Sequence, residues 1–134
     1  MALIDGVKDG TIDVIVSDHQ PHDQESKKLE FDLADFGIIG QQSFYSALLS
    51  VFGKDTDQII GKVSQAPRSI LGSTPVTISE GNAATLTLYT PEESWTYSAE
   101  VNESNSEASP FLGKELKGKV MGIVNDGEVL TNGY

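Results

Sequence analysis

The stretch from residue 11 to residue 22 constrains the fold of this chain more than any other. Residues 12–16 are rich in Val and Ile, and Asp18, His19 and His22 follow closely. An apolar run of β-branched residues is typical of a parallel strand that is covered on both faces. If residues 12, 14 and 16 fill the interior of a (β/α)8 barrel, alternation directs Asp18 into the mouth of the barrel, where active sites lie. We therefore expect Asp18 to be a metal ligand or a general base.

A long charged segment follows this predicted strand. Residues 21–42 carry many acidic and basic side chains without a helical or strand period. Loops of this length in compact domains are usually functional or disordered. The segment is therefore expected either to cover an active site or to be a solvated, mobile surface loop.

Helical patterns come next. Ser43 can cap a helix over residues 44–52 that ends at Gly53, and a second helix is expected to begin near residue 55 or 56. A short helix over residues 67–71, opened by a proline, completes the set. The apolar stripes of these helices are interpreted as core, which includes Ile59, Ile60 and Val63.

The sequence changes character after residue 72, where β-branched alternation and turns replace the helical patterns. The pair Asp126-Gly127 predicts a tight hairpin turn between the last two strands. The polar residues 102–109 are interpreted as a mobile connector. Short strands are expected at residues 76–78, 85–89, 95–98, 120–124 and 129–131. The pattern predicts an α/β chain with two parts, residues 1–72 and residues 73–134.

Charge and composition exclude several classes of partner. A net charge of −11 makes nucleic acid and anionic membrane surfaces poor partners, because binding would begin with electrostatic repulsion. No apolar stretch approaches the roughly 20 residues needed to cross a bilayer, so we expect a soluble protein that does not bind membranes. The absence of cysteine excludes disulfides and thiolate metal sites and mildly favours a cytoplasmic location.

Several motifs together resemble the dihydroorotases, which are cyclic amidohydrolases of pyrimidine biosynthesis. Residues 18–22, Asp-His-Gln-Pro-His, and residues 36–40, Phe-Gly-Ile-Ile-Gly, are similar to the last barrel strand and the following loop of that family. The resemblance continues in the same order through residues 65–72, 78–84 and 110–118, so that it covers nearly the whole chain. The first two motifs are fairly specific, whereas hydantoinases and allantoinases share the later ones more loosely.

The resemblance implies a fold and a set of functional residues. Residues 1–72 would be the last strand, active-site loop and terminal helices of a (β/α)8 TIM-type barrel, and residues 73–134 would supply strands of a small β-sandwich beside it. Asp18 would bind zinc and shuttle a proton while a zinc-bound hydroxide attacks the cyclic amide of dihydroorotate. The remaining family positions are substrate-binding: His22 would contact the substrate's carboxylate, and the backbone of Phe36 and Gly37 would approach the pyrimidine ring. His19 points to the other face of the strand, which favours a supporting or packing role.

Part of the family pattern has no counterpart in this chain. Dihydroorotases of this kind are much longer, and the His-x-His pair after their first barrel strand is missing, since His19 and His22 are the only histidines. Residues 1–10 are typical of the tail of a helix ending at Gly10, as though the chain began inside an element. We therefore expect a C-terminal fragment of a zinc enzyme. The fragment alone is expected to hold no stable zinc, to be inactive and to self-associate through unpaired strand edges.

Other residues depart from the family pattern without removing Asp18 or His22. Gln20 stands where the family usually has Ala, and Gln41-Gln42-Ser43 replaces a common Leu-Glu-Thr. Three functions therefore stay open for the longer protein. The first, which we favour, is a zinc-dependent dihydroorotase. The second is a noncatalytic dihydroorotase-like assembly subunit, and the third is another cyclic amidohydrolase, such as a hydantoinase or an allantoinase.

Overall fold

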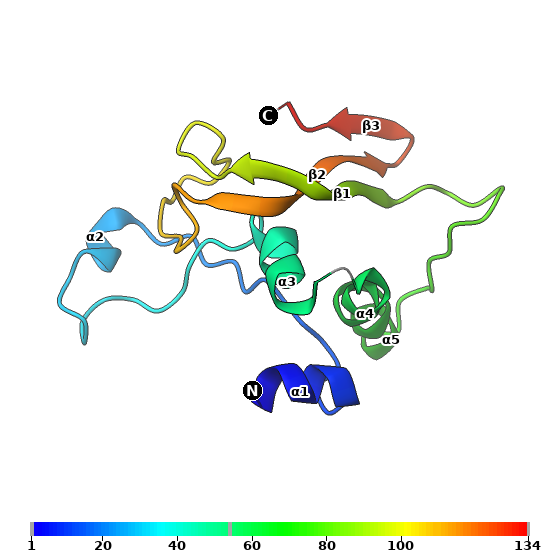
Figure 1. Cartoon of the computed structure of the whole chain (residues 1–134), viewed down its shortest axis with the longest axis horizontal. Helices are drawn as coiled ribbons and strands as arrows, with labels where there is room; N and C mark the ends of the chain where they lie inside the picture. Colours follow the sequence, from blue (N-terminus) through cyan, green and yellow to red (C-terminus); the bar gives the residue numbers. More distant parts are fainter. Residues whose placement is uncertain (1, 54, 134) are drawn as a thin grey trace.

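The computed structural model describes residues 2–53 and 55–133, and it combines short helices with one antiparallel sheet (Figure 1). The sheet lies along one side of the molecule, α3 packs beneath it, and α1 lies farther from the sheet (Figure 1). The elements in chain order are α1 (Ala2–Asp9), α2 (Gln24–Lys27), α3 (Phe44–Phe52), α4 (Thr56–Ile60), the π-helix η1 (Gly61–Gln65), α5 (Ala66–Ile70), β1 (Leu86–Thr96), β2 (Glu115–Asn125) and β3 (Glu128–Thr131).

The sheet has the order β1-β2-β3, and both pairs of strands are antiparallel. Asp126 and Gly127 connect β2 to β3 with φ angles of 50° and 81°, which are the left-handed conformations of a tight hairpin turn. This confirms the predicted hairpin. The strands predicted at 85–89 and 95–98 are in fact one strand, β1, because the turn expected at Thr90–Glu93 is a register shift within the ladder. Residues 76–78 form no strand.

The helices largely follow the sequence pattern. The prediction for residues 44–52 is confirmed by α3, and Gly53 ends the helix at φ 66° with its N–H bonded to the carbonyl of Leu49. Ser43 precedes α3 but makes no capping bond, because its backbone is already helical and its hydroxyl donates to the Gly40 carbonyl at 3.5 Å. The helices predicted from residue 55 and at 67–71 form one continuous helical stretch, α4, η1 and α5.

The expected inward face of this stretch is only partly correct. Ile59 is buried, with 4% of its surface exposed, whereas Ile60 is 37% exposed. The two residues are adjacent and point about 100° apart around the helix, and here only Ile59 faces the core.

A buried polar cluster joins α3 to the sheet. The hydroxyl of Ser46 donates to the carbonyl of Gly118 on β2 at 2.6 Å, and the indole N–H of Trp95 donates to the same carbonyl at 3.0 Å. A side chain at Gly118 would meet Leu49 on α3, since a Cβ there would lie 2.6 Å from its Cδ2. Trp95 also packs with Tyr97 and Ile39 in the hydrophobic core.

Residues 12–16, predicted to be a buried parallel strand, do not form a strand in this structure. A parallel strand needs hydrogen-bonding neighbours, and here the backbone finds other partners. The N–H of Ile12 donates to Gly6 and the N–H of Ile15 donates to Lys62, whose ammonium group donates to the carbonyl of Ile12. Val16, expected to face a barrel interior, is 68% exposed. Among the described residues, no helix has the length and apolar character needed to cross a bilayer.

Candidate active site at the residue 18–39 loop

Asp18 lies at the start of the loop in a conformation that is rare for its residue type. Its φ angle is 42°, in the left-handed region that costs a non-glycine residue about 1 kcal/mol or more, and such strain is found often at functional sites. The carboxylate is exposed, and its Oδ2 accepts a hydrogen bond from Nε2 of Gln20 at 2.9 Å. Asp18 is therefore held by a neighbour on the same loop and is accessible to a substrate.

The two ends of the loop meet beside Asp18. His19 and Ile38 form an isolated parallel bridge, and the N–H of Gln20 donates to the Ile38 carbonyl at 2.9 Å. The Nδ1 atom of His19 accepts from the N–H groups of Gly40 at 3.3 Å and Gln41 at 3.4 Å. Nδ1 is thus an unprotonated acceptor, which places the ring proton of the neutral imidazole on Nε2. His19 therefore holds the far end of the loop through its ring.

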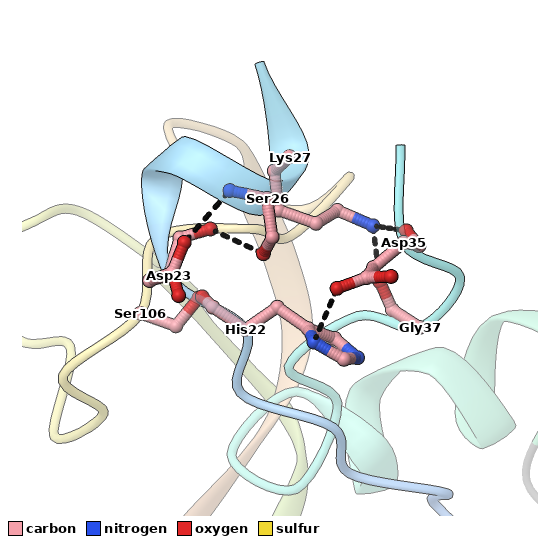
Figure 2. Close-up of polar contacts among 7 residues, drawn as sticks. All are labelled: His22, Asp23, Ser26, Lys27, Asp35, Gly37 and Ser106. Carbon is pink, nitrogen blue, oxygen red and sulfur yellow. Dashed lines mark hydrogen bonds and ion pairs between the residues drawn. The ribbon is translucent and has the colours of Figure 1, made fainter. Parts of the chain in front are cut away.

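His22 is half-buried and is held through both its backbone and its ring (Figure 2). Its carbonyl accepts a hydrogen bond from the hydroxyl of Ser106 at 2.6 Å, and its ring Nδ1 lies 3.5 Å from Oδ2 of Asp35. The Asp35 side chain is 57% exposed, so this contact orients the ring and adds little stability.

Lys27 ties the centre of the loop together (Figure 2). It lies on α2, and its ammonium group donates to the carbonyl of Asp35 and, at 2.8 Å, to that of Gly37. Asp23 begins α2 by accepting the N–H of Ser26 at 2.7 Å, and this hydrogen bond holds the pKa of the Asp23 carboxyl below its ordinary value.

Phe36 and Gly37 occupy the turn that Lys27 fixes. The Phe36 ring is 90% exposed, which leaves it available for contact with a ligand or another part of a protein. Gly37 has a φ angle of 108°, and a Cβ there would lie 2.6 Å from Oε1 of Gln20. Only glycine suits this position, because it tolerates positive φ and allows close approach of another group.

The structure thus gathers the sequence-predicted residues around one loop. Gln20 contacts both Asp18 and the backbone at Gly37, while Asp35 connects the His22 ring to the turn that contains Phe36. Within residues 2–53 and 55–133, no group of three or more His, Cys, Asp or Glu side chains could hold a metal ion. A zinc site takes three or four protein ligands. The described residues therefore do not make up a zinc site, although Asp18 could provide one ligand.

The sequence interpretation missed three residues of this site. Lys27 and Asp35 were indistinguishable from the other charges of the loop, since their contacts follow no helical or strand period. Ser106 belongs to the segment interpreted as a mobile connector, but it is only 5% exposed, and the amide of Asn102 donates to its carbonyl at 2.9 Å. The buried hydroxyl shows that this segment packs against the candidate site instead.

Comparison with known proteins gives the chain clear relatives, although no family model matches it. It is 40% identical to a dihydroorotase of Elusimicrobium minutum over 98% of its own length and 32% of that protein. It is 36% identical to a dihydroorotase of Caldicellulosiruptor saccharolyticus over 96% of its length and 31% of that protein. The chain therefore spans about a third of the length of the curated relatives it matches.

Solved structures give a second group of similar proteins. A D-hydantoinase (dihydropyrimidinase) from Thermus sp. matches 98% of the chain and 31% of its own length, with a TM-score of 0.78 and 27% identity. A dihydropyrimidinase from Brevibacillus agri has the same TM-score of 0.78 at 23% identity, which shows a shared fold alone.

Proposed function

We propose that this chain, which is similar to dihydroorotases along almost its whole length, supplies the C-terminal part of a cyclic amidohydrolase. One observation carries the proposal. The identity of 34–40% to dihydroorotases extends over the loop on which Asp18, His22, Phe36 and Gly37 are gathered. In this proposal residues 1–72 belong to the barrel of the longer protein and residues 73–134 to its β-sandwich.

Asp18 is proposed as the acid–base residue of the reaction. An exposed carboxylate can collect the proton of the attacking water and deliver it to the leaving nitrogen of a cyclic amide. The hydrogen bond from the N–H of Gln20 to the carbonyl of Ile38 fixes the backbone beside Asp18. Zinc, which the resemblance implies, would need further ligands from residues outside this chain. We therefore expect the chain alone to be inactive.

His22 and the turn at Phe36–Gly37 are proposed to bind the substrate. The substrate class is a cyclic amide with a carboxylate, for which dihydroorotate is the favoured candidate, interconverted with N-carbamoyl-aspartate in pyrimidine biosynthesis. An imidazole can donate a hydrogen bond to the carboxylate. The glycine lets the backbone approach the ring of the substrate closely. A cytoplasmic location would suit this substrate.

A hydantoinase is the second candidate function. The observation in its favour is the 27% identity to the Thermus sp. D-hydantoinase, whose fold the chain matches with a TM-score of 0.78. A panel of substrates distinguishes the two candidate functions. A dihydroorotase requires the carboxylate of its substrate, whereas a hydantoinase does not require a carboxylate at that ring position.

The proposal can be tested by replacing the matching segment of the Elusimicrobium minutum dihydroorotase with this chain. We expect the chimera to hydrolyse or form dihydroorotate, and we expect Asp18→Asn to lower its turnover by about 10²- to 10⁴-fold, because an amide cannot relay a proton. Asp13→Asn, which changes another exposed carboxylate of the same segment, is the matched control and should leave turnover unchanged.

A folded chimera without activity would instead support a noncatalytic assembly role. Near-normal turnover by the Asp18→Asn chimera would contradict the assignment of Asp18. Preference for hydantoins over dihydroorotate would favour the second candidate.

A further inference from the structure

The three residues 106–108 contact both ends of the loop that carries the candidate site. The hydroxyl of Ser106 donates to the carbonyl of His22 at 2.6 Å, near the start of the loop (Figure 2). The carbonyl of Ala108 accepts the N–H of Ile39 at 3.0 Å, at the end of the loop. Between them, the Glu107 carboxylate accepts a hydrogen bond from Gln24 at 3.3 Å. A short segment from the C-terminal part thus holds a loop from the N-terminal part at three places.

Ser106 is itself fixed in place. Its side chain is buried, its hydroxyl also accepts the N–H of Ala108 at 3.2 Å, and its own N–H donates to the hydroxyl of Ser104 at 3.2 Å. Asn102 further binds the carbonyl of Ser106 and accepts a hydrogen bond from the Tyr97 hydroxyl at 2.8 Å. The Ser106 hydroxyl therefore presents a donor to His22 from a well-defined position.

The far end of the loop is equally well anchored. Ile39 is 1% exposed and packs with Trp95 and Tyr97 in the core, so the backbone that follows Gly37 cannot move without disturbing that core. Since Ser106 and Ala108 are two residues apart and share the Ser106 hydroxyl, the positions of the two loop ends are linked. Any displacement of His22 relative to the Gly37 turn requires one of these contacts to break.

We propose that Ser106 is a positioning residue, which sets the place of the His22 imidazole relative to Asp18 and the Gly37 turn through its hydrogen bond to the His22 carbonyl. This inference deepens the proposed function and rests on it for the role of His22 in substrate binding. Ser106 itself is not proposed to touch the substrate. It acts by holding the backbone from which the imidazole projects, so its removal affects binding of the substrate more than the chemical step.

Ser46 provides a matched control for a purely structural role. Its hydroxyl is also buried and also donates to a distant backbone carbonyl at 2.6 Å, that of Gly118, but it lies between α3 and β2. Ser106→Ala and Ser46→Ala each remove one buried hydroxyl that bonds a carbonyl. Each hydroxyl also accepts one N–H, that of Ala108 at Ser106 and that of the Trp95 indole at Ser46, so the variants differ in which carbonyl and which N–H are released.

The first measurement uses the 134-residue chain and follows hydrogen exchange at single amides. We expect Ser106→Ala to speed exchange of the His22 and Ile39 amides by roughly threefold to tenfold, the loss of protection that one hydrogen bond provides. We expect Ser46→Ala to leave these two amides at the wild-type rate while it speeds exchange around α3.

The second measurement uses the chimera with the Elusimicrobium minutum dihydroorotase. Ser106→Ala is expected to raise KM for dihydroorotate by roughly threefold to tenfold with kcat changed by less than about twofold, the pattern of a lost binding contribution. Ser46→Ala should change neither constant beyond about twofold.

The two measurements keep the inference and the proposed function separate. Equal exchange at His22 and Ile39 in Ser106→Ala and wild type overturns the inference, whether or not the chimera is active. Faster exchange with an unchanged KM in an active chimera also overturns it, because the loop would then be displaced without effect on binding. An inactive chimera overturns the proposed function alone, and the exchange rates still decide whether Ser106 positions His22.

Discussion

Gly37 is the residue whose replacement is expected to disturb the candidate site most directly. At φ 108° its Cβ would lie 2.6 Å from Oε1 and 2.7 Å from Cβ of Gln20. Gly53 makes a suitable comparison, because it has φ 66° and nothing within 4 Å of its Cβ position. The two glycines thus separate the cost of positive φ from the cost of a steric clash.

We expect Gly37→Ala to lower the free energy of unfolding by about 2–3 kcal/mol and Gly53→Ala to lower it by about 1 kcal/mol, as measured by urea unfolding. The double variant Gln20→Ala, Gly37→Ala should recover only part of the difference, since it removes the clash with Oε1 of Gln20 and leaves the close approach to the Cβ at position 20. Equal losses for the two single glycine variants would show that Gln20 moves aside freely.

Gln20 also bears on the reactivity of Asp18. Its side-chain amide donates to Oδ2 of the carboxylate at 2.9 Å. This donor occupies one lone pair of Oδ2 and holds the carboxylate in one orientation, so its removal leaves the carboxylate freer to accept a proton. We expect Gln20→Ala in the chimera to raise kcat roughly threefold, in keeping with the loss of one hydrogen bond to an exposed charged group. A fall in kcat would indicate that the amide positions Asp18 productively.

Among the elements, α3 contains a buried group that lacks a partner. The Tyr45 ring lies 4.5 Å from that of Tyr89 between ring centroids, and the Tyr45 hydroxyl is buried with no hydrogen-bond partner among the described residues. Burial raises the pKa of Tyr45 to about 12. In the unfolded chain a tyrosine ionises near pH 10.

The stability of the fold should therefore depend on alkaline pH through Tyr45. Below about pH 10 the tyrosine is neutral in both states, and between about pH 10 and pH 12 only the unfolded chain loses the proton, which lowers the free energy of unfolding as pH rises. Tyr45→Phe should remove this contribution and cost no stability at neutral pH, because no hydrogen bond is lost.

Tyr97→Phe is the matched comparison for this prediction. It loses the hydrogen bond to Asn102, and it should be destabilised at neutral pH by about 1 kcal/mol. Urea unfolding at neutral and alkaline pH measures both effects. A Tyr45→Phe variant with the same alkaline dependence as the wild type would contradict the prediction.

The elements that could be predicted from sequence are those whose signals are local. α3 has its apolar face and Gly53 within a few residues of each other, and the β2–β3 hairpin has Asp126 and Gly127 in its turn. Residues 12–16 carry an equally strong strand pattern, but a parallel strand exists only beside neighbours that a local pattern does not supply.

The difference between local signals and long-range contacts also explains how much of the candidate site could be predicted. Asp18, His22, Phe36 and Gly37 were predicted as site residues because they belong to two compact motifs that resemble a known family, and the structure places them around one loop. Ser106 and Lys27 were missed because their roles depend on contacts with distant or irregular backbone, which leave no periodic trace in the sequence.

The molecule as a whole exposes much apolar surface, and we expect it to self-associate in isolation. The outer strand β3 is exposed along its length, with Val129 at 62% and Leu130 at 58%. An exposed apolar edge strand is a template for pairing with a second chain. Val16 at 68% adds to this surface in the segment predicted to need neighbours.

Light scattering over a range of protein concentration tests this expectation. The wild type should form dimers or larger species as concentration rises, and Val129→Lys should shift the equilibrium toward monomer, because a charge at the edge opposes strand pairing. Phe31→Lys, which changes a 96% exposed ring on the loop, is the control and should leave the equilibrium unchanged. A strict monomer at high concentration would show that the edges are not used for association.

The bond between Ser106 and His22 also sets an order of events during synthesis of the chain. The two residues are 84 positions apart, so the loop with the candidate site leaves the ribosome long before its anchor has been made. At about 5–20 residues per second, that interval lasts roughly 4–17 seconds. During this time Asp18 and His22 exist without the contact that fixes their relative positions. The anchor of the site is completed only once residue 106 has been made, and a chain cut before residue 106 contains every sequence-predicted site residue without the hydroxyl that holds the His22 backbone in place.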